Sequence, residues 1–385
     1  MQYRVCKASG NKLSILGFGC MRFPPLGNEA ERMVLSAIDG GVNFFDTAYL
    51  YPGSEKTLGA ILKKSGKRDK VFVATKLPLA MCKKYEDFER FFQKQLARLQ
   101  TDYIDYYFMH NITSMAWWQT MLDLGIARWI AEKKASGQIR QIGFSYHGSG
   151  EEFPKVLNSY PWEFCMIQYN YYDENYQAGK RGLLAAAEKN LTVFVMEPLL
   201  GGKLVNLPKK AEEPFRLANP NKTPVEWALN WIWNHDEVTL LLSGMTNTAQ
   251  TAANIRTATD FAPISDSDLA VYRDVKAEFA KSFRVKCTAC NYCLPCPKGI
   301  DIPARLSAYN TSFAQNYFTG LTMYVTGMGI ASRNPISSHL CNACGKCEKA
   351  CPQGLAVSSE IKKVAQRFEP LPIRILMRIV RAFMG

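Results

Sequence analysis

The sequence predicts an α/β protein: a (β/α)8 TIM barrel followed by a small domain of helices and loops. Eight short apolar runs, rich in β-branched and aromatic residues, recur between residues 14 and 245, which is typical of strands buried on both faces of a parallel sheet. Helical stretches separate these runs. The third observation is that eight cysteines fall in two short segments after residue 286, whereas the rest of the 385-residue chain contains four.

Strands and helices alternate regularly along the first part of the chain. Eight strands over roughly 250 residues favour a closed barrel over an open doubly wound sheet. The segment GFGCMR after the first strand lacks the Gly-x-Gly-x-x-Gly of a dinucleotide-binding sheet. The predicted strands cover residues 14–19, 42–47, 71–77, 103–110, 142–146, 164–170, 192–199 and 238–245. The predicted helices cover residues 29–40, 54–66, 85–100, 117–137, 149–161, 181–190, 223–235 and 246–258.

Composition excludes several classes of protein. Hydrophobic residues make up 47% of the chain, enough for a large core, but no apolar run approaches the ~18 residues of a transmembrane helix. The N-terminal residues MQYRVCKASGNK lack the apolar centre of a secretory signal peptide. Because the cysteines are clustered rather than spread as a disulfide framework, we expect a reducing, cytoplasmic location.

The formal net charge of the chain is +13. Basic residues are spread along the sequence, and no zinc-finger, helix-turn-helix or RNP pattern is present, so nucleic-acid binding is not predicted. Two interpretations of the charge stay open. One is a solvated basic surface, and the other is docking to an acidic partner, such as a ferredoxin, or to an anionic membrane.

The two cysteine clusters have the spacing of iron–sulfur ligands. The first run reads C-x2-C-x2-C-x2-C-P from Cys287 and the second C-x2-C-x2-C-x3-C-P from Cys341. Three cysteines of such a run hold one cubane, and the fourth, before proline, ligates the other cluster. Zinc is the alternative, but zinc favours C-x2-C pairs separated by a longer loop. We predict two [4Fe–4S] clusters, the first held by Cys287, Cys290, Cys293 and Cys351 and the second by Cys341, Cys344, Cys347 and Cys296.

These patterns divide the chain into four parts. We expect the barrel over 1–265, a linking helix over 266–284 and a two-cluster ferredoxin-type domain over 285–356. The first run has one residue fewer before its last cysteine than a bacterial two-cluster ferredoxin, and the long insertion between the runs predicts helix around 307–327. Residues 357–385 predict a basic amphipathic helix that packs on the barrel or makes weak peripheral contact with a membrane.

Polar residues follow three consecutive predicted strands at the end of the barrel where catalytic residues gather. Asp46, Lys76 and His110 end the second, third and fourth strands, and Tyr51 lies in the loop after the second. Singly they are also typical of a helix cap, a solvated lysine and a core histidine. Together they predict carbonyl reduction: the lysine lowers the pKa of the tyrosine, the aspartate holds the lysine, and the histidine orients the carbonyl oxygen.

The chain resembles the aldo-keto reductase family from about residue 14 to 258. The similarity is carried by the segments GFGCMR, FFDTAYLYPGSEKTLG, VFVATKL, DYIDYYFMHN, IRQIGFS, IQYNYYD and MEPLLGGKL. With its cysteine-rich tail the chain resembles the iron–sulfur-containing branch of that family. The resemblance implies a reductase barrel whose four catalytic residues are Asp46, Tyr51, Lys76 and His110.

The resemblance also implies a nicotinamide cofactor, NAD(P)H. Ser145 and Gln168 stand where the family holds the nicotinamide amide. Met196 replaces the aromatic residue that commonly stacks on the nicotinamide, and Pro198 and Leu199 follow it among the implied cofactor contacts.

The last loop of the barrel, SGMTNTAQTAANI, fits the adenosine-phosphate segment of the family through Gly244, Gln250 and Asn254. It contains no arginine or lysine to bind a 2′-phosphate, so the sequence does not indicate a preference for NADP. After Ser145 the usual asparagine is replaced by Tyr146, which is followed by His147.

Three functions stay open. The first is an enzyme that moves a hydride between NAD(P)H and a small carbonyl or alcohol substrate. The second is a ferredoxin-linked oxidoreductase with a flavin or another one-electron centre in the barrel, because clusters transfer single electrons whereas nicotinamide takes a hydride. The third is a non-catalytic redox-sensing subunit. The four polar residues favour an enzyme, and we expect an oxidoreductase of the first kind.

Overall fold

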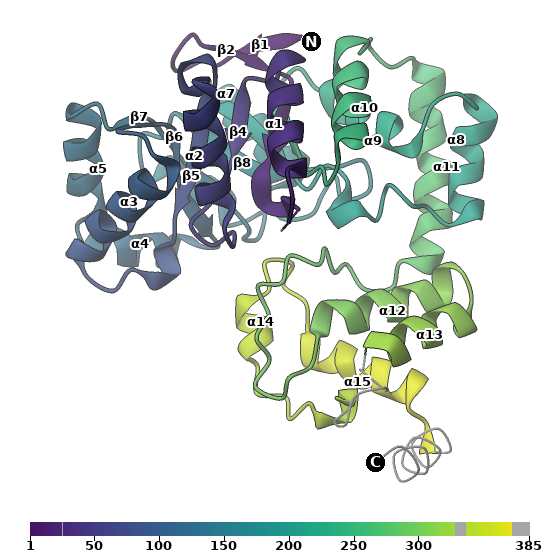
Figure 1. Cartoon of the computed structure of the whole chain (residues 1–385). Coiled ribbons are helices and arrows are strands. Elements are labelled where there is room, and N and C mark those ends of the chain that lie inside the picture. Colours follow the sequence, from purple (N-terminus) through teal and green to yellow (C-terminus); the bar gives the residue numbers. More distant parts are fainter. Residues whose placement is uncertain (25, 328–335, 372–385) are drawn as a thin grey trace. The chain divides into compact units, whose positions relative to one another are not determined.

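The computed structural model describes residues 1–24, 26–327 and 336–371. The chain divides into two compact units, both visible in Figure 1. The first contains Met1–Leu199 and Val225–Ile264, and the second contains Leu200–Pro224 and the residues from Ser265 on.

The first unit is a closed barrel of eight parallel strands in the order β10-β3-β4-β5-β6-β7-β8-β9, so the predicted fold class is confirmed. Aromatic rings fill its interior: the centroids of Phe108 and Phe164 are 4.7 Å apart, and those of Phe44 and Phe194 are 4.9 Å apart. Burial on both faces explains the nearly continuous apolar runs of the sequence. The strands are β3 (Leu16–Gly19), β4 (Phe44–Asp46), β5 (Phe72–Leu77), β6 (Ile104–Ile112), β7 (Ile139–Tyr146), β8 (Phe164–Gln168), β9 (Thr192–Met196) and β10 (Val238–Ser243).

Helices surround this barrel (Figure 1). The single helix predicted over 117–137 is two helices, because Gly125 between them has a φ of 88°, a left-handed conformation that glycine adopts without steric cost. The helices are α1 (Glu29–Asp39), α2 (Ser54–Ser65), α3 (Tyr85–Leu99), α4 (Met115–Asp123), α5 (Ile126–Ala135), α6 (Phe153–Asn158), α7 (Gly179–Glu188), α9 (Pro224–Trp233) and α10 (Thr248–Thr259).

An antiparallel hairpin of β1 (Tyr3–Val5) and β2 (Lys12–Ser14) precedes the barrel. The sequence does not predict this hairpin, because strands of three residues are too short to show alternating burial. Cys6 and Leu13 are fully buried in the same hydrophobic cluster as the aromatic rings inside the barrel. Leu13 of β2 and Cys6, just after β1, therefore belong to the barrel core, whereas Tyr3 and Val5 of β1 are exposed.

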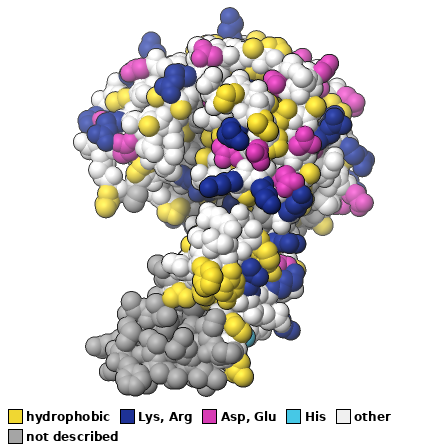
Figure 2. All heavy atoms as spheres, turned by 90° about the vertical axis from the view of Figure 1, so that its right-hand side faces the viewer, with side chains coloured by type: hydrophobic (Ala, Val, Ile, Leu, Met, Phe, Trp, Pro, Cys, Tyr) yellow, Lys and Arg dark blue, Asp and Glu magenta, His cyan; other side chains and the backbone are white. Residues whose placement is uncertain are grey.

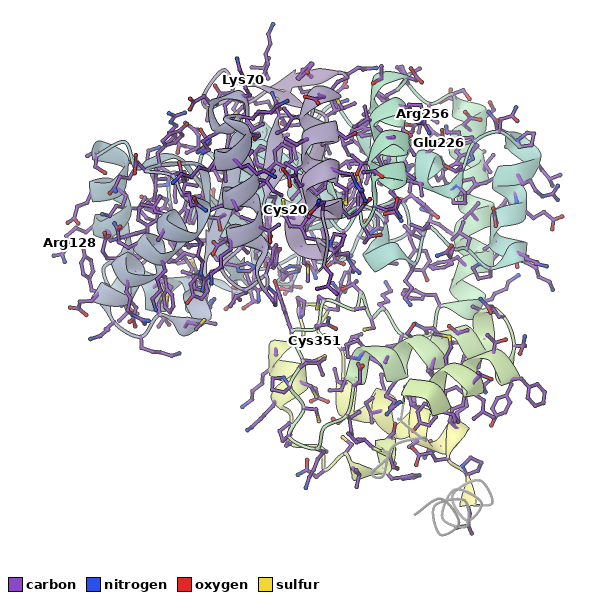
Figure 3. The ribbon with its side chains drawn as sticks, viewed as in Figure 1. Cys20, Lys70, Arg128, Glu226, Arg256 and Cys351 are labelled. Carbon is purple, nitrogen blue, oxygen red and sulfur yellow. The ribbon has the colours of Figure 1, made fainter. Side chains whose placement is uncertain are left out.

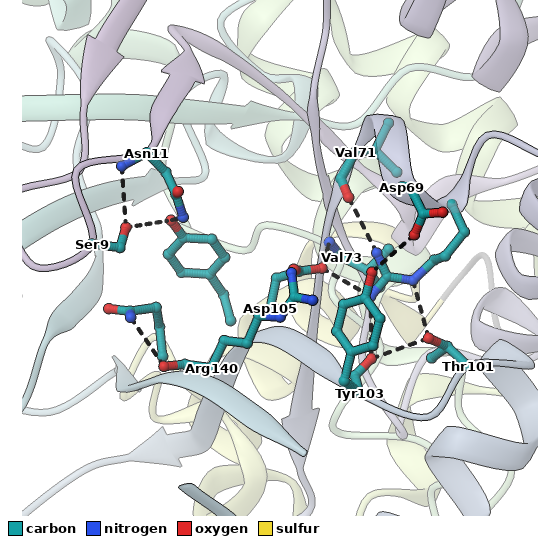
Figure 4. Close-up of polar contacts among 12 residues, drawn as sticks. Ser9, Asn11, Asp69, Val71, Val73, Thr101, Tyr103, Asp105 and Arg140 are labelled. Carbon is teal, nitrogen blue, oxygen red and sulfur yellow. Dashed lines mark hydrogen bonds and ion pairs between the residues drawn. The ribbon is translucent and has the colours of Figure 1, made fainter. Parts of the chain in front are cut away.

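A buried charge network lies at the start of β6, at the amino end of the barrel strands. Asp105 is 2% exposed and accepts hydrogen bonds from Arg68, from Arg140 and from the Val73 backbone N–H, each at 2.9 Å (Figure 4). The two guanidinium groups lie 4.2 and 3.8 Å from the centroid of the Tyr103 ring. Because functional residues of such barrels gather at the opposite end, this network serves to hold neighbouring strands together.

The second unit packs helices and cysteine-containing loops around a core of its own. Val285, Leu306, Ile361 and Phe368 are buried in this core. Helix α12 lies beside α13 (Figure 1). The helices are α8 (Lys209–Ala218), α11 (Asp266–Ser282), α12 (Ile302–Ala314), α13 (Tyr317–Gly327), α14 (Lys346–Ala350) and α15 (Val357–Phe368).

Short 3-10 helices occur in both units. Those among the described residues are η1 (Cys20–Arg22), η2 (Arg68–Lys70), η3 (Leu79–Met81), η4 (Leu200–Gly202) and η5 (Ser338–Leu340).

The second unit includes a segment, 200–224, that the sequence assigns to the barrel. Within this segment Phe215 of α8 packs on Tyr272 of α11 with the ring centroids 5.3 Å apart. The sequence does not predict α8, because Pro214 lies inside it and Pro208 directly precedes it, and prolines interrupt a helical pattern.

The surface charge and the C-terminal segment are relevant to the two predicted kinds of partner, an acidic protein and a membrane. On the face shown in Figure 2, Lys and Arg side chains are interspersed with Asp and Glu, which favours the solvated-surface interpretation of the net charge. Among the described helices, none has both the length and the apolar character needed to cross a membrane. Helix α15 takes up the first part of the predicted basic segment 357–385, and residues 372–385 lie outside the described residues.

Candidate functional site

A buried ion pair lies at the carboxyl ends of β4 and β5. Lys76 donates hydrogen bonds to both carboxylate oxygens of Asp46, each at 2.6 Å, and to the Thr47 carbonyl at 2.8 Å. The Lys76 and Asp46 side chains are 2% and 5% exposed. Because an unpaired charge at this depth is strongly unfavourable, each group requires the other.

Tyr51 and His110 lie beside this ion pair. The Lys76 ammonium is 4.9 Å from the centroid of the Tyr51 ring and 5.3 Å from that of Phe108. The rings of Tyr51 and His110 meet edge to face with their centroids 6.2 Å apart. The structure thus brings all four residues predicted from the strand ends into one cluster at the barrel mouth.

Burial controls protonation in this cluster. It raises the pKa of Asp46 and lowers that of Lys76, and the attraction between the two charges opposes both shifts. Burial, aided by the charge of Lys76, holds the pKa of His110 well below its usual value. Its imidazole is therefore neutral near pH 7 and can donate a hydrogen bond while carrying no charge.

Three of the predicted cofactor positions lie at the carboxyl ends of the next strands. The Ser145 hydroxyl accepts a hydrogen bond from the Asn111 backbone N–H at 2.8 Å. Gln168 and Met196, the last residues of β8 and β9, are paired across the two strands. The side-chain carbonyl of Gln168 is buried and has no hydrogen-bond partner among the described residues. Since a buried acceptor without a donor is costly, this atom is suited to receive an N–H from a ligand.

Pro198 and Leu199 follow a turn at the end of β9. Glu197, before them, has a φ of 56°, and its carbonyl accepts a hydrogen bond from the Asn170 side chain at 3.3 Å. Pro198 is buried and Leu199 is half-buried. Pro198 and Leu199 thus follow Met196, the last residue of β9, by two and three residues.

Two of the cofactor positions predicted in the last barrel loop, Gln250 and Asn254, form hydrogen bonds within the protein. Asn254 donates to the Ser243 hydroxyl at 3.0 Å, and the Gln250 side-chain carbonyl accepts from the Thr246 backbone N–H at 2.9 Å. A Cβ atom on Gly244 would lie 3.4 Å from the side chain of Arg22, an exposed residue of the loop after β3. An arginine from another loop therefore lies beside the segment, although the segment itself has no basic residue.

The clustered cysteines line two cavities in the second unit, which includes Cys351 directly after α14 (Figure 3). The two cavities have volumes of about 330 and 410 Å³ when the solvent at their openings is included. The residues of the smaller cavity include Cys287, Cys290, Cys293 and Cys351. Those of the larger include Cys296, Cys341, Cys344 and Cys347, and Cys293 borders it as well.

The thiols and a hydroxyl group at the smaller cavity are suited to bind a cluster that contains sulfide. Cys287, Cys290 and Cys293 line the same cavity. Burial raises the pKa of Cys293 to about 12, and charge on Cys287 and Cys290 adds to the shift. The Thr288 hydroxyl lines the same cavity, is buried and has no hydrogen-bond partner among the described residues. It can donate to a cluster sulfide or thiolate. The residues present therefore fit an iron–sulfur cluster.

The amino-acid sequence matches two family models. A model described as the aldo/keto reductase family matches residues 15–276, more than half of the chain. The chain belongs to the aldo/keto reductase family. A second model, described as a 4Fe-4S dicluster domain, matches residues 286–357 of this aldo/keto reductase, which supports the predicted iron–sulfur tail.

Individual aldo/keto reductases are similar to this one over the barrel. The structure of the aldo-keto reductase AKR11C1 from Bacillus halodurans (holo form) superposes with a TM-score of 0.59 at 26% identity, covering 71% of this chain and 96% of that one. The aldo-keto reductase yakc [NADP(+)] of Schizosaccharomyces pombe is 26% identical over 226 residues. The aldo-keto reductase str7 of Strobilurus tenacellus is 26% identical over 223 residues. For both proteins the match covers 54% of this chain and 64% of the relative's length.

Two more side chains at the mouth of this aldo/keto reductase have no role assigned from the sequence. Cys20 is fully buried after β3 (Figure 3), and burial raises its pKa, with the charge of Asp46 adding to the shift. His147 follows β7, where burial lowers its pKa to about 4 and the charge of Lys76 also acts in that direction. The one feature of the sequence that indicates His147 as a residue of the barrel mouth is its position two residues after Ser145.

The low pKa values of the two histidines predict a loss of stability in acid. In the unfolded chain both side chains titrate near 6.5, so below that pH the unfolded state binds more protons than the folded state. The free energy of unfolding of the barrel should be unaffected by these groups above about pH 7 and should fall as the pH drops from about 6.5 toward the folded pKa of His147, about 4. Urea unfolding followed by tryptophan fluorescence at several pH values measures this slope.

The matched variant for this measurement is His147→Gln. It should reduce the slope of the unfolding free energy against pH between pH 6.5 and 5 by up to one proton, because the lowered pKa of His147 no longer contributes. An unchanged slope in the variant would contradict the assignment of a buried, neutral His147.

Proposed function

We propose that the protein is an oxidoreductase that reduces a small carbonyl compound, or oxidises the corresponding alcohol, with NAD(P)H, and that its tail carries two [4Fe–4S] clusters. The observation that carries the proposal is the position of the Lys76 ammonium, 2.6 Å from the Asp46 carboxylate and 4.9 Å from the Tyr51 ring centroid. A cation held against a phenol favours the charged form of that phenol. Membership of the aldo/keto reductase family supports the same reaction.

In the direction of reduction, the Tyr51 hydroxyl gives its proton to the carbonyl oxygen. Lys76 stabilises the phenolate that remains, and Asp46 keeps the lysine charged and in place. The neutral imidazole of His110 donates a hydrogen bond that orients the carbonyl oxygen. When bound, the nicotinamide supplies the hydride that completes the alcohol.

Several residues are suited to hold the nicotinamide cofactor. The Gln168 carbonyl would accept from the amide N–H, and the Ser145 hydroxyl, which accepts from the Asn111 backbone N–H, would donate to the amide oxygen. The name of the fission-yeast relative specifies NADP(+), which supports a nicotinamide cofactor in this protein. The remaining proposed contacts are Met196, Pro198, Leu199, Gly244, Gln250 and Asn254, with Arg22 beside Gly244.

The cysteine-lined cavities support the assignment of the cluster ligands. We assign the smaller cavity to a cluster held by Cys287, Cys290, Cys293 and Cys351, and the larger to one held by Cys341, Cys344, Cys347 and Cys296. In each set three ligands come from one run and the fourth from the other run, as in two-cluster ferredoxins.

The full chain, purified without oxygen, provides the direct test. We expect oxidation of NADH or NADPH that depends on an added aldehyde such as 4-nitrobenzaldehyde, together with about eight iron and eight sulfide ions per chain for two [4Fe–4S] clusters. If neither nucleotide is oxidised with any of a panel of aldehydes and ketones, the reductase assignment is wrong. Zinc in place of iron would contradict the cluster assignment alone.

Substitution of a cluster ligand should halve the metal content. In Cys344→Ser one cluster loses a thiolate, so the iron content should fall from about eight to about four ions per chain. Cys82→Ser is the matched control, because Cys82 is buried in the barrel unit and burial raises its pKa to about 12, and its iron content should stay unchanged. Full iron content in Cys344→Ser would argue against its role as a ligand.

The two cavities also favour a second candidate function, a ferredoxin-linked oxidoreductase. Clusters transfer single electrons, so this function needs a flavin or another one-electron centre in the barrel and an electron donor such as an acidic ferredoxin. Flavin in the purified protein, with cluster reduction by a reduced ferredoxin but by neither NADH nor NADPH, would favour it. The hydride-transfer proposal expects no flavin.

A further inference from the structure

The segment Leu200–Pro224 brings a lysine to the first cysteine run, within the second unit. Its backbone first meets that run at Gly201, which has a φ of 64°. A Cβ atom on Gly201 would lie 2.3 Å from the carbonyl oxygen of Thr288, so no side chain fits there. Thr288 directly follows the proposed ligand Cys287 and lines the smaller cavity. The close backbone approach therefore fixes the start of the segment against the loop that would hold one cluster.

Lys203 follows two residues later and lies beside the same loop. Its ammonium donates to the hydroxyl of Ser307 in α12 at 3.2 Å, and Leu306, the neighbour of Ser307, lines the smaller cavity. The side chain is half-buried. Burial lowers the pKa of Lys203, and charge on the Cys287 sulfur opposes this shift. This agrees with the position of the Lys203 ammonium on Ser307, next to the cavity-lining Leu306.

The ammonium of Lys203 has no carboxylate partner among the described residues, and its hydrogen-bond partner is the neutral hydroxyl of Ser307. Its positive charge is therefore not cancelled locally. The larger cavity is different. The lysine at its lining is Lys298, which is exposed, and water and salt screen the charge of an exposed side chain much more strongly than that of a half-buried one.

We propose that Lys203 raises the reduction potential of the cluster held by Cys287, Cys290, Cys293 and Cys351, and that this cluster is the more easily reduced of the two. A cubane with four thiolate ligands is anionic, and the electron that reduces it adds another negative charge. A nearby fixed cation stabilises the reduced form more than the oxidised form, and local charge is one of the factors that set cluster potentials. The inference rests on the cluster assignment proposed above.

The test is an EPR-monitored redox titration of the full chain, purified without oxygen and reduced with dithionite through mediators. Iron and sulfide are measured first for every variant. Lys203→Met and Lys203→Gln remove the charge, and each should shift the ratio of reduced to oxidised cluster roughly tenfold toward oxidised at fixed potential, about 59 mV for one electron. Only the higher of the two midpoint potentials should fall. Lys203→Arg keeps the charge and should keep that potential.

Lys298→Met is the matched control and should leave the higher potential unchanged. Unchanged midpoints in a neutral Lys203 variant with full iron content would overturn the inference, and so would an equal fall of both midpoints, which would indicate a general change in the second unit. If either Lys203→Met or Lys203→Gln loses iron, the midpoint potentials of the other variant decide the test. Absence of clusters from the unsubstituted protein would instead overturn the cluster assignment, so the two failures are distinguishable.

Discussion

Tyr51→Phe should lower the turnover of an aldehyde by about 10²–10⁴-fold, the range that a positioned general acid contributes. The substitution removes the hydroxyl that donates the proton and keeps the ring that contacts Lys76 and His110. The four proposed cluster ligands of each cavity are untouched, so the visible spectrum and the iron content should not change. Steady-state rates with NADH and NADPH, compared at equal iron content, measure the effect.

The same loop offers a matched control for this prediction. Tyr49 is half-buried like Tyr51, but its ring packs on Phe91 with the centroids 4.9 Å apart and lies beneath the guanidinium of Arg98 at 4.2 Å. Tyr49→Phe keeps this packing and should retain turnover. If Tyr51→Phe retains turnover as well, the assignment of Tyr51 as the proton donor is wrong.

Lys76→Met should abolish turnover and also destabilise the barrel. Removal of the ammonium leaves the Asp46 carboxylate buried at 5% exposure without its partner. Breaking a buried ion pair in this way costs about 3–5 kcal/mol of folding free energy. Urea unfolding followed by tryptophan fluorescence should therefore show a lower midpoint, and the activity of the folded fraction should be lost.

A double-mutant cycle with Asp46→Asn separates the two effects. The double variant Asp46→Asn/Lys76→Met has no unpaired charge, so its stability should recover much of the loss seen in Lys76→Met. Its activity should not recover, because the cation beside Tyr51 is still absent. Recovery of both stability and turnover in the double variant would show that Lys76 acts only as a structural partner of Asp46.

Much of the barrel could be predicted because its signals are local. Each strand is a short apolar run, and the ends of three consecutive runs place Asp46, Lys76 and His110 at one end of a barrel before any coordinate is known. The hairpin β1–β2 and helix α8 could not be predicted in the same way. Three-residue strands carry too little pattern, and Pro214 inside α8 hides a helix that packing on α11 stabilises.

The candidate site divides in a similar way. The cysteine runs could be assigned to clusters from spacing, because a C-x2-C-x2-C run supplies three ligands from one loop. The surroundings of the ligands could not. Nothing near His147 in the sequence indicates that the charge of Lys76 lowers its pKa or that His147 in turn lowers the pKa of His110. The last barrel loop likewise does not indicate that Arg22 lies beside Gly244.

The sequence by itself therefore determined the alternation of strands and helices in the barrel, the four polar residues of its mouth and the two cysteine runs. Each of these predictions depends on residues that are neighbours in the chain or that recur at a fixed period. The tertiary structure alone decided that residues 200–224 join the second unit, that Gly201 packs against Thr288 in the loop of Cys287, and that Lys203 bonds to Ser307. The physical reason is that charge and burial act through space. The residues around positions 203 and 287 in the sequence do not indicate that the two positions are close in the folded chain.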